Sequence, residues 1–375
     1  MREARRAGAE AADCGPKLDP LVDAARDRAA LASMAWAVDR LGGDSPAAAT
    51  MAADLSADAR AIVGRWLDEL RRSGHLSADI RWVSAPPSRA EVDRAWAEAL
   101  ALAPDPGAGG ALTRFFAACS RNLPALLTGE VRLQSLLFDQ DDIAAEIYRT
   151  NEASRYTNAA AAEVVRARCR GVLRSGRTPQ VLEVGGGVGG TTEAVLDTVR
   201  DLPLRYHFTD VGDWFVTRAC THWAGRAGLS AGILDINDAS ERQREALGDL
   251  AGGIDVVLAA NVMHNAVDVS SSLRILADLC RPEAALALIE TGTEHLPLLI
   301  SMRFLMTLPP PGSGIGGDRT RTGRTLLDTT DWSEVVAASG WDLLDVLPGP
   351  DDDHPAARYD QHVWHAVRAP KETDR

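Results

Sequence analysis

Apolar side chains in the first third of the chain recur at the spacing of helices rather than strands. One run follows the i, i+3, i+4, i+7 pattern of a single helix face and consists of Leu31, Met34, Ala35, Val38 and Leu41. A second face follows Ser56, a favourable N-cap residue, and consists of Ile62, Val63, Trp66, Leu67 and Leu70. We therefore predict a mainly helical lid or substrate domain over residues 19–150. Residues 1–18 are polar without periodicity and are predicted to be a disordered tail.

A short extended run at 80–83 allows two interpretations of this helical domain. It follows the second predicted helix and Gly74, which is the order of elements in a winged helix. The simpler interpretation is a small helical subdomain without a wing. The sequence leaves both open.

The pattern changes near residue 180, where short β-branched runs alternate with helical stretches. The runs are 181–184, 206–209, 254–260 and 284–290, with two later ones at 341–347 and 362–366. They are apolar throughout, as expected for strands that are buried on both faces of a parallel sheet. We therefore predict an α/β, doubly wound domain over residues 151–375.

Composition and charge exclude several classes of protein. Hydrophobic residues make up 46% of the chain and charged residues 25%, which is typical of a globular protein. The net charge of −13 is wrong for a nucleic-acid-binding protein, and no apolar run approaches the roughly 20 residues that span a bilayer. The five cysteines lie far apart without a CxxC pair, so we expect no metal site and a location in the reducing cytoplasm.

A glycine-rich sequence, VLEVGGGVGGTTEAVL, lies where the first predicted strand of the α/β domain meets a helix. Gly185, Gly187 and Gly189 allow a tight turn and a close approach of the backbone to a ligand. Asp210 ends the next strand, at the position of a carboxylate that accepts hydrogen bonds from ribose hydroxyls. The pattern therefore predicts a site for a nucleoside-containing cofactor.

Two kinds of cofactor share this arrangement, and the glycine spacing does not separate them. Gly185, Gly187 and Gly190 also fit the G-x-G-x-x-G pattern of dinucleotide sites, in which a pyrophosphate lies at a helix N-terminus. Glu183 favours S-adenosylmethionine (SAM) instead. Its carboxylate suits a cationic sulfonium ligand with an amino group and would be unfavourable beside a pyrophosphate.

Several motifs in order resemble those of class I SAM-dependent methyltransferases. The likeness is strongest to the C-methyltransferase domains of polyketide synthases and of mixed polyketide–nonribosomal peptide synthetases. The motifs are VLEVGGGVGGTT, YHFTDVG, LDI, DVVLAANVMH and ALALIETG, preceded by LLTGEVRLQSLLFDQ and AAEIYRTNEASRYTNA, which resemble the lid of those domains. The resemblance implies a seven-stranded Rossmann-like core, a helical lid and SAM as the cofactor. After Glu290 the sequence departs from the synthase pattern, in the region that should shape the acceptor pocket.

Two residues at strand ends are candidates for the catalytic groups. His264 follows the fourth strand and Glu290 ends the fifth. Neighbouring parallel strands bring their carboxyl ends to the same edge of the sheet, so we expect the two side chains to hydrogen-bond and to form a general-base pair. In the synthase domains that this chain resembles, the corresponding pair removes the α-proton of a β-ketoacyl thioester before methylation.

Four further residues are weaker candidates. The resemblance implies that Tyr156, in the lid sequence SRYTNA, lines the active site. Asn261 is a plausible polar contact near the cofactor. Asp235 follows the third strand and suits the adenine amino group, with Ile236 packed on the ring.

The motifs together predict a SAM-dependent C-methyltransferase of natural-product biosynthesis. Its expected substrate is an acyl or aminoacyl thioester on a carrier protein, and the chain resembles a free-standing enzyme that acts in trans. The alternative is an O- or N-methyltransferase of a small molecule, because VGGGVG and MHNAVD overlap with the patterns of such enzymes. A non-catalytic SAM-binding module is a third, less favoured interpretation. Arginines after the fifth strand, at 303, 319, 321 and 324, are predicted to form a basic docking surface for the carrier protein.

Overall fold

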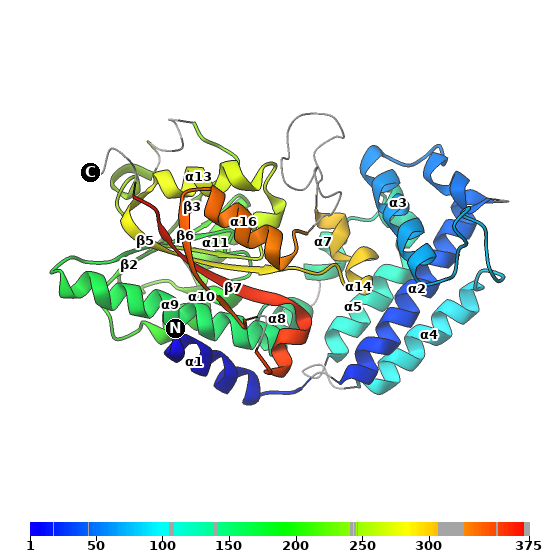
Figure 1. Ribbon diagram of the computed structural model, residues 1–375, viewed down its shortest axis with the longest axis horizontal. Coiled ribbons are helices and arrows are strands. Elements are labelled where there is room, and N and C mark those ends of the chain that lie inside the picture. The colour runs from blue at the N-terminus through cyan, green and yellow to red at the C-terminus, as the bar shows by residue number, and fades with distance from the viewer. Residues whose placement is uncertain are drawn as a thin grey trace. The chain divides into compact units, whose positions relative to one another are not determined.

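The computed structural model describes residues 1–17, 19–43, 45–104, 109–138, 141–240, 243, 245, 247–306, 326–349 and 352–370. The chain divides into two compact units (Figure 1). One contains Met1–Gly15, Glu152–Thr293 and Pro311–Arg375, and the other contains Pro16–Asn151 and Glu294–Pro310. The sequence predicts two successive domains, 19–150 and 151–375. The assignment of 1–15 to the first unit and of 294–310 to the second differs from this prediction.

The first unit contains a seven-stranded sheet with the strand order β3-β2-β1-β4-β5-β7-β6. Strands β1 to β5 run parallel, and β7 is antiparallel to both β5 and β6. The strand bounds are β1 Gln180–Val184, β2 Arg205–Asp210, β3 Leu229–Ile233, β4 Ile254–Ala260, β5 Cys280–Thr291, β6 Trp341–Leu347 and β7 Gln361–Arg368. This topology confirms the predicted doubly wound α/β fold with a seven-stranded core.

Helices cover both faces of this sheet (Figure 1). On one face α1 (Arg2–Asp13), α9 (Glu152–Arg174) and α10 (Gly190–Thr198) pack on alternate strand residues such as Val181 and Val256. On the other face α13 (Val269–Asp278) and α16 (Thr329–Ala338) pack on the intervening residues, such as Leu182 and Val257. The remaining elements are α11 (Asp213–His222) and the short helices η4 (Gly248–Leu250), η5 (Met263–Asn265) and η7 (Pro355–Tyr359). Because helices cover both faces of the sheet, the side chains on both faces of its central strands are buried, and this explains why these strands are apolar throughout.

The N-terminal residues form helix α1 rather than the expected disordered tail. Ala4, Gly8 and Ala12 recur every four residues along its buried side, and the helix packs along α9. A β-carbon on Gly8 would lie only 3.0 Å from the carbonyl oxygen of Tyr156, so the two helices meet at a residue without a side chain. Small residues carry a weak hydrophobic signal, and this is why the pattern of apolar positions does not reveal the helix.

The second unit is helical in the part that the structure describes. Its main helices are α2 (Pro20–Gly42), α3 (Ala57–Arg72), α4 (Arg89–Leu102) and α5 (Gly110–Arg121). Shorter ones are η1 Pro46–Met51, α6 Leu123–Thr128, α7 Leu133–Phe138, α8 Asp141–Ala145, the π-helical turn η3 Glu146–Thr150, α14 Leu296–Leu299 and η6 Met302–Leu305. The extended run near residue 80 forms a single antiparallel bridge, between Leu76 and Trp82. The helical prediction for this region is therefore confirmed.

The segment after β5 returns to the helical unit. The indole of Trp66 donates to the carbonyl of Leu299 at 2.9 Å, and Arg65 bonds to Glu294 at the same distance. The sequence predicts Arg303 on a basic surface, but this side chain is 3% exposed and donates to the Met306 carbonyl at 2.6 Å. Burial lowers the pKa of Arg303. The prediction is wrong for Arg303, and positions 319, 321 and 324 lie outside the described residues.

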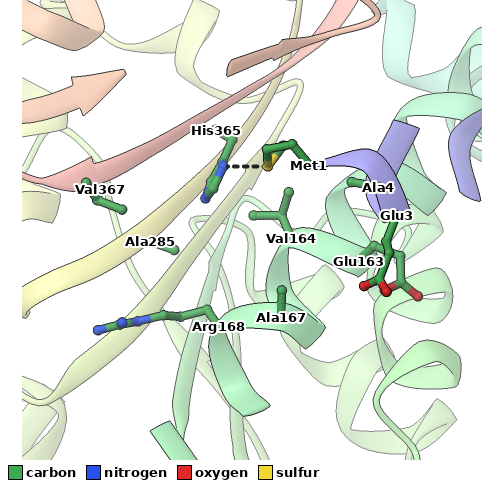
Figure 2. Close-up of a pocket in the computed structure, with 10 residues that line it drawn as sticks. All are labelled: Met1, Glu3, Ala4, Glu163, Val164, Ala167, Arg168, Ala285, His365 and Val367. Atoms are coloured by element: carbon green, nitrogen blue, oxygen red, sulfur yellow. Dashed lines mark hydrogen bonds between the residues drawn. The ribbon is translucent and has the colours of Figure 1, made fainter. Parts of the chain in front are cut away.

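A cavity of about 230 Å³ lies in the first unit between α1, α9 and the strands β5 and β7 (Figure 2). Ala285 and Val367 contribute to its wall, and Nδ1 of His365 lies 3.1 Å from the sulfur of Met1. Ala285 precedes the carboxyl end of β5 by six residues, so the cavity is separate from the strand ends that carry the predicted site. In the part of the chain that the structure describes, no helix is long and apolar enough to cross a membrane.

Candidate active site

The glycine-rich loop connects β1 to α10, and its shape depends on glycine at defined positions. Gly185 and Gly187 have φ angles of +62° and +53°, in the left-handed region. A β-carbon on Gly185 would lie 2.2 Å from a methyl group of Val262, so this turn closes against the end of β4 only with glycine. A β-carbon on Gly187 would meet the carbonyl oxygen of Gly185 at an ordinary contact distance of 3.9 Å, so at this position glycine is favoured by the backbone angle rather than by crowding.

Asp210 lies at the end of β2 and is held against the loop. Its Oδ2 accepts the Gly187 N–H at 2.9 Å, and its Oδ1 accepts the Gly212 N–H at 2.8 Å. Each carboxylate oxygen has a second lone pair, so the side chain can still accept hydrogen bonds from two hydroxyl groups. A glycine turn with a fixed carboxylate beside it fits the ribose and the amino-acid end of SAM.

Glu183 is buried in β1 and faces the protein interior. One carboxylate oxygen accepts the hydroxyl of Thr192 at 2.7 Å and that of Tyr206 at 2.9 Å. Burial raises the pKa of Glu183 to about 7, although the two hydroxyl donors oppose this shift. The structure thus places Glu183 beneath the first turn of α10, where it joins β1, β2 and the loop.

The carboxylate of Glu290 is fully buried at the end of β5 and is surrounded by donors from the turn after β4. Its Oε1 accepts the backbone N–H groups of Val262 (3.1 Å), Met263 (2.7 Å) and His264 (3.3 Å). Its Oε2 lies 2.7 Å from Nδ1 of His264. The structure therefore brings the two predicted catalytic residues together, and η5 both binds the carboxylate and presents the imidazole.

These contacts define which nitrogen of His264 is basic. Carboxylates are ordinarily ionised at neutral pH, and an ionised carboxylate only accepts hydrogen bonds. Nδ1 of His264 therefore carries the proton that Oε2 of Glu290 accepts, and Nε2 is the basic nitrogen. The His264 side chain is 13% exposed and that of Glu290 is 0% exposed, so the imidazole faces the site and the carboxylate lies behind it.

Asn261 directly follows β4 in an unusual backbone conformation. Its φ angle is +52°, which is uncommon for a residue other than glycine, and its N–H donates to the carbonyl of Ile289 at 2.8 Å. The side-chain oxygen accepts from Nε2 of Gln361 at 3.1 Å, and Oε1 of Gln361 lies 3.5 Å from the Thr157 hydroxyl. Gln361 could not be found from the sequence, because nothing in the pattern of β7 shows that its first residue contacts the residue after β4.

Asp235 and Ile236 lie after β3 in a loop that is closed by its own hydrogen bonds. Oδ1 of Asp235 accepts the backbone N–H and the side-chain amide of Asn237, at 2.9 and 3.2 Å. Its backbone groups bond to the side chain of Gln243. Ile236 is 8% exposed and packs in the same apolar cluster as Leu234.

Tyr156 lies near the start of α9 and is fully buried. Its ring packs beside His354, with centroids 5.2 Å apart, and its hydroxyl lies 3.5 Å from Oδ2 of Asp352. Burial raises the pKa of Tyr156, and the Asp352 charge adds to the rise. A residue two positions later, Asn158, reaches the glycine-rich loop instead, since its Oδ1 accepts the hydroxyl of Thr191 at 2.8 Å.

Comparison with known proteins identifies a family and several large relatives. A family model described as a methyltransferase domain matches residues 182–286. Polyketide synthase ThaG of Burkholderia thailandensis is 34% identical over 266 residues, which are 68% of this chain and 4% of ThaG. Lovastatin diketide synthase lovF of Aspergillus terreus is 29% identical over 293 residues (74% of this chain, 11% of lovF). Pyochelin synthetase PchF of Pseudomonas aeruginosa is 27% identical over 344 residues (85% and 18%). The chain therefore spans between 4% and 18% of these relatives' length.

Solved structures share the fold over nearly the whole chain. The CurJ carbon methyltransferase has a TM-score of 0.79 at 20% identity and covers 93% of this chain and 92% of its own. The DszA carbon methyltransferase has a TM-score of 0.78 at 22% identity, with 93% and 91% covered. The trans-methyltransferase CalH, solved in complex with SAH, has a TM-score of 0.68 at 18% identity, with 95% and 93% covered. These likenesses establish the fold of both units.

Proposed function

Because this chain belongs to the class I SAM-dependent methyltransferases, we propose that it methylates a carbon atom of a thioester-bound acyl or aminoacyl group. The carrier would be an acyl or peptidyl carrier protein, and the pathway one of natural-product biosynthesis. This substrate class is supported by the names of the relatives ThaG, lovF and PchF, which are a polyketide synthase, a diketide synthase and a pyochelin synthetase. The word carbon in the names of the CurJ and DszA methyltransferases supports the acceptor atom.

The cofactor is SAM, which supplies an electrophilic methyl group on a sulfonium when it is bound. We assign its binding to the loop of Gly185, Gly187 and Gly189, and to Asp210 for the ribose hydroxyls. Asn261 directly follows β4 and is assigned a polar contact with the amino-acid end of SAM. Asp235 is assigned a hydrogen bond with the adenine amino group, and Ile236 is assigned packing on the adenine ring. Glu183 supports the loop from beneath through Thr192.

In the proposed reaction His264 is the general base. The α-carbon of a β-ketoacyl thioester loses its proton to Nε2, and the electron pair left on carbon would form a bond to the methyl group in line. The methyl–sulfur bond would break as this bond forms, and its electron pair would stay on sulfur, which leaves as a neutral thioether. The imidazole then holds a proton on each nitrogen, and Oε2 of Glu290, 2.7 Å from Nδ1, stabilises this cation. Later release of the Nε2 proton to water restores the base. Tyr156, for which the resemblance of the lid implies a place in the active site, is given no part in this reaction, because its ring is fully buried beside α1 and His354.

One observation carries this proposal: the buried Glu290 carboxylate bonded to three backbone N–H groups and to His264. A carboxylate held in this way fixes the imidazole tautomer before substrate arrives. A general base must lie within reach of the proton that it removes, with its basic nitrogen directed at that proton. The arrangement meets the second requirement for removal of the α-proton.

The partner and location are part of the same proposal. The chain would meet a carrier protein that belongs to another polypeptide, an arrangement that the term trans-methyltransferase describes for CalH. All five cysteines are free thiols, which supports a reducing cytoplasmic location.

The position of the transferred methyl group tests the proposal. The protein is incubated with ¹³C-methyl-labelled SAM and either a β-ketoacyl carrier protein or its pantetheine thioester mimic, and the product is examined by NMR. The expected product carries the label on the α-carbon. A labelled methyl ether or N-methyl group would instead establish the O- or N-methyltransferase alternative.

A further inference from the structure

A second histidine–carboxylate pair lies at the start of β7, on the opposite side of β5 from His264. His362 is 4% exposed. Its Nδ1 lies 2.7 Å from the carbonyl oxygen of Pro348, and its Nε2 lies 2.8 Å from Oδ1 of Asp360. The same carboxylate accepts the hydroxyl of Thr329 at 2.9 Å and that of Thr293. The proposed reaction uses none of these groups.

The contacts require a doubly protonated imidazole. A carbonyl oxygen only accepts hydrogen bonds, so Nδ1 of His362 must donate to Pro348. Burial alone would raise the pKa of Asp360, but hydrogen bonds from His362, Thr293 and Thr329 outweigh burial and lower it. Asp360 is therefore ionised, and Nε2 must donate to it as well. His362 is thus a buried cation paired with a carboxylate that is itself partly exposed.

This pair is joined to the strand that carries Glu290. His362 and Glu290 are direct partners in the antiparallel register of β5 and β7, so their side chains leave the same face of the sheet. Two residues after Glu290, the N–H of Gly292 donates to the Asp360 carbonyl at 2.7 Å. The next residue, Thr293, bonds to the Asp360 carboxylate. Both backbone and side chain of Asp360 therefore fix the segment that leaves β5.

We propose that His362 is a positioning residue that acts through Asp360 to hold the end of β5, and so sets the place of the Glu290 carboxylate behind His264. This inference rests on the proposed function of the His264–Glu290 pair. Without His362, Asp360 would lose its charged partner, and the Gly292–Thr293 segment would lose a fixed anchor. A small displacement of Glu290 would then misalign the base, and misplacement by about 1 Å can cost on the order of a hundredfold in rate.

Kinetic constants of two variants test the proposal. His362→Gln removes the cation, and Thr293→Val removes only the bond between Asp360 and the segment after β5. Both variants are expected to lower kcat. For His362→Gln the loss should be about tenfold or more, because a misaligned base transfers the proton more slowly. KM for SAM should stay unchanged, because within the described residues the side-chain hydrogen bonds of His362 and Thr293 go to Pro348 and Asp360 and not to the glycine-rich loop. Thr293 lies at the surface, so its variant keeps the test valid if His362→Gln does not fold.

A matched control is available on the same strand. His365 lies three positions along β7, on the side of the sheet that faces α1, where it contacts Met1 (Figure 2). His365→Gln changes a histidine of the same strand without touching Asp360, and it should leave kcat unchanged. An equal loss of kcat in the His365 and His362 variants would mean that β7 acts only as a structural support, and the inference would be wrong.

A double-mutant cycle with Glu290→Gln separates this inference from the proposed function. If His362 acts through Glu290, the double variant should be no slower than Glu290→Gln alone. Additive losses would overturn the positioning role and leave the general-base proposal standing. Normal turnover of the single Glu290→Gln variant would instead overturn the general-base proposal.

The protonation states can be measured without any methyl acceptor. In ¹⁵N-histidine-labelled protein at neutral pH, His362 is expected to show two protonated ring nitrogens, and His264 one, at Nδ1. The His362→Gln variant serves to assign the His362 signals. A neutral His362 would contradict the proposed ion pair with Asp360.

Discussion

At the scale of single residues, the site depends on which groups surround each carboxylate. Glu290 meets three backbone N–H groups and an imidazole, Asp210 meets two backbone N–H groups, and Glu183 meets two hydroxyls. The residue types and their places at strand ends can be predicted from the sequence. The donors cannot, since most of them are backbone groups whose directions depend on how η5 and the glycine-rich loop turn.

The general-base pair leads to a prediction for catalysis. His264→Ala is expected to slow methyl transfer by on the order of 10²–10⁴-fold, because the proton acceptor is lost. Glu290→Gln should cost less, because the side-chain amide keeps an oxygen that can still accept from Nδ1. Single-turnover rates measure the loss, and calorimetric titration with SAM should give unchanged affinity for both variants. His207→Gln, on β2 beside Ser230, is the control. Near wild-type turnover of His264→Ala would be incompatible with the mechanism.

Asp210 leads to a prediction for cofactor affinity. Asp210→Ala removes a carboxylate that would accept two ribose hydroxyls, and charge-assisted hydrogen bonds contribute about 1.5–3 kcal/mol each. We expect SAM affinity in titration calorimetry to fall at least about tenfold, the equivalent of about 1.4 kcal/mol. Asp197→Ala, at an exposed position of α10, should bind SAM normally. Equal affinity of the two variants would remove Asp210 from the cofactor site.

Glu183 leads to a prediction for the pH dependence of stability. Its pKa rises from an ordinary value of 4.5 to about 7 in the folded protein. The folded state therefore binds more protons than the unfolded state between these values, and stability falls as the pH rises through this window. A shift of this size corresponds to about 3 kcal/mol.

The variant Glu183→Gln does not titrate, so its unfolding free energy should decline less between pH 4.5 and 7 than that of the wild type. Urea unfolding at a series of pH values measures this slope. Glu146, whose pKa burial also raises to about 7, keeps its own contribution in both proteins. Identical slopes for the two proteins would show that the Glu183 carboxyl titrates normally.

At the scale of elements, the apolar pattern predicts the runs of the β-branched strands, whereas it gives no run for β3, which is expected only as the third strand before Asp235. The runs that became β1, β2, β4 and β5 are buried on both faces of the sheet. The segment of β3 contains Ser230 and Gly232 and lies at the sheet edge, where its residues are only half buried or exposed, so its pattern carries no strong strand signal. Helix α1 was missed for the related reason that it packs through alanine and glycine.

The contact between α1 and α9 leads to a prediction for stability. Gly8→Leu would place a side chain where a β-carbon already meets Tyr156 at 3.0 Å, and such overpacking typically costs 1–3 kcal/mol. Gly64→Leu is the matched control, because Gly64 lies in the middle of α3 and a β-carbon there meets nothing within 4 Å. Chemical denaturation should show a loss for Gly8→Leu only. Equal stability of the two variants would mean that α1 does not pack on Tyr156.

At the scale of the whole molecule, the chain has two units, and the order of segments within them could not be predicted from the sequence alone. Residues 294–310 follow the sheet strand β5 but belong to the helical unit, because Leu299 meets the indole of Trp66 and Glu294 meets Arg65. These contacts join residues more than 200 positions apart, and no local pattern reveals them. The fold class and the places of the loop, the base and its carboxylate were open to prediction because each follows a strand of the sheet.

If His264 removes a proton from carbon, the protein should exchange that proton with solvent even before a methyl group is transferred. The protein is incubated in D₂O with a β-ketoacyl thioester whose α-carbon carries one methyl group and one hydrogen, in the absence of SAM, and deuterium at the α-carbon is followed by NMR. We predict exchange that is faster than in buffer, that is lost in His264→Ala and that is slowed in Glu290→Gln. Exchange at the same rate with wild type and His264→Ala would contradict the account.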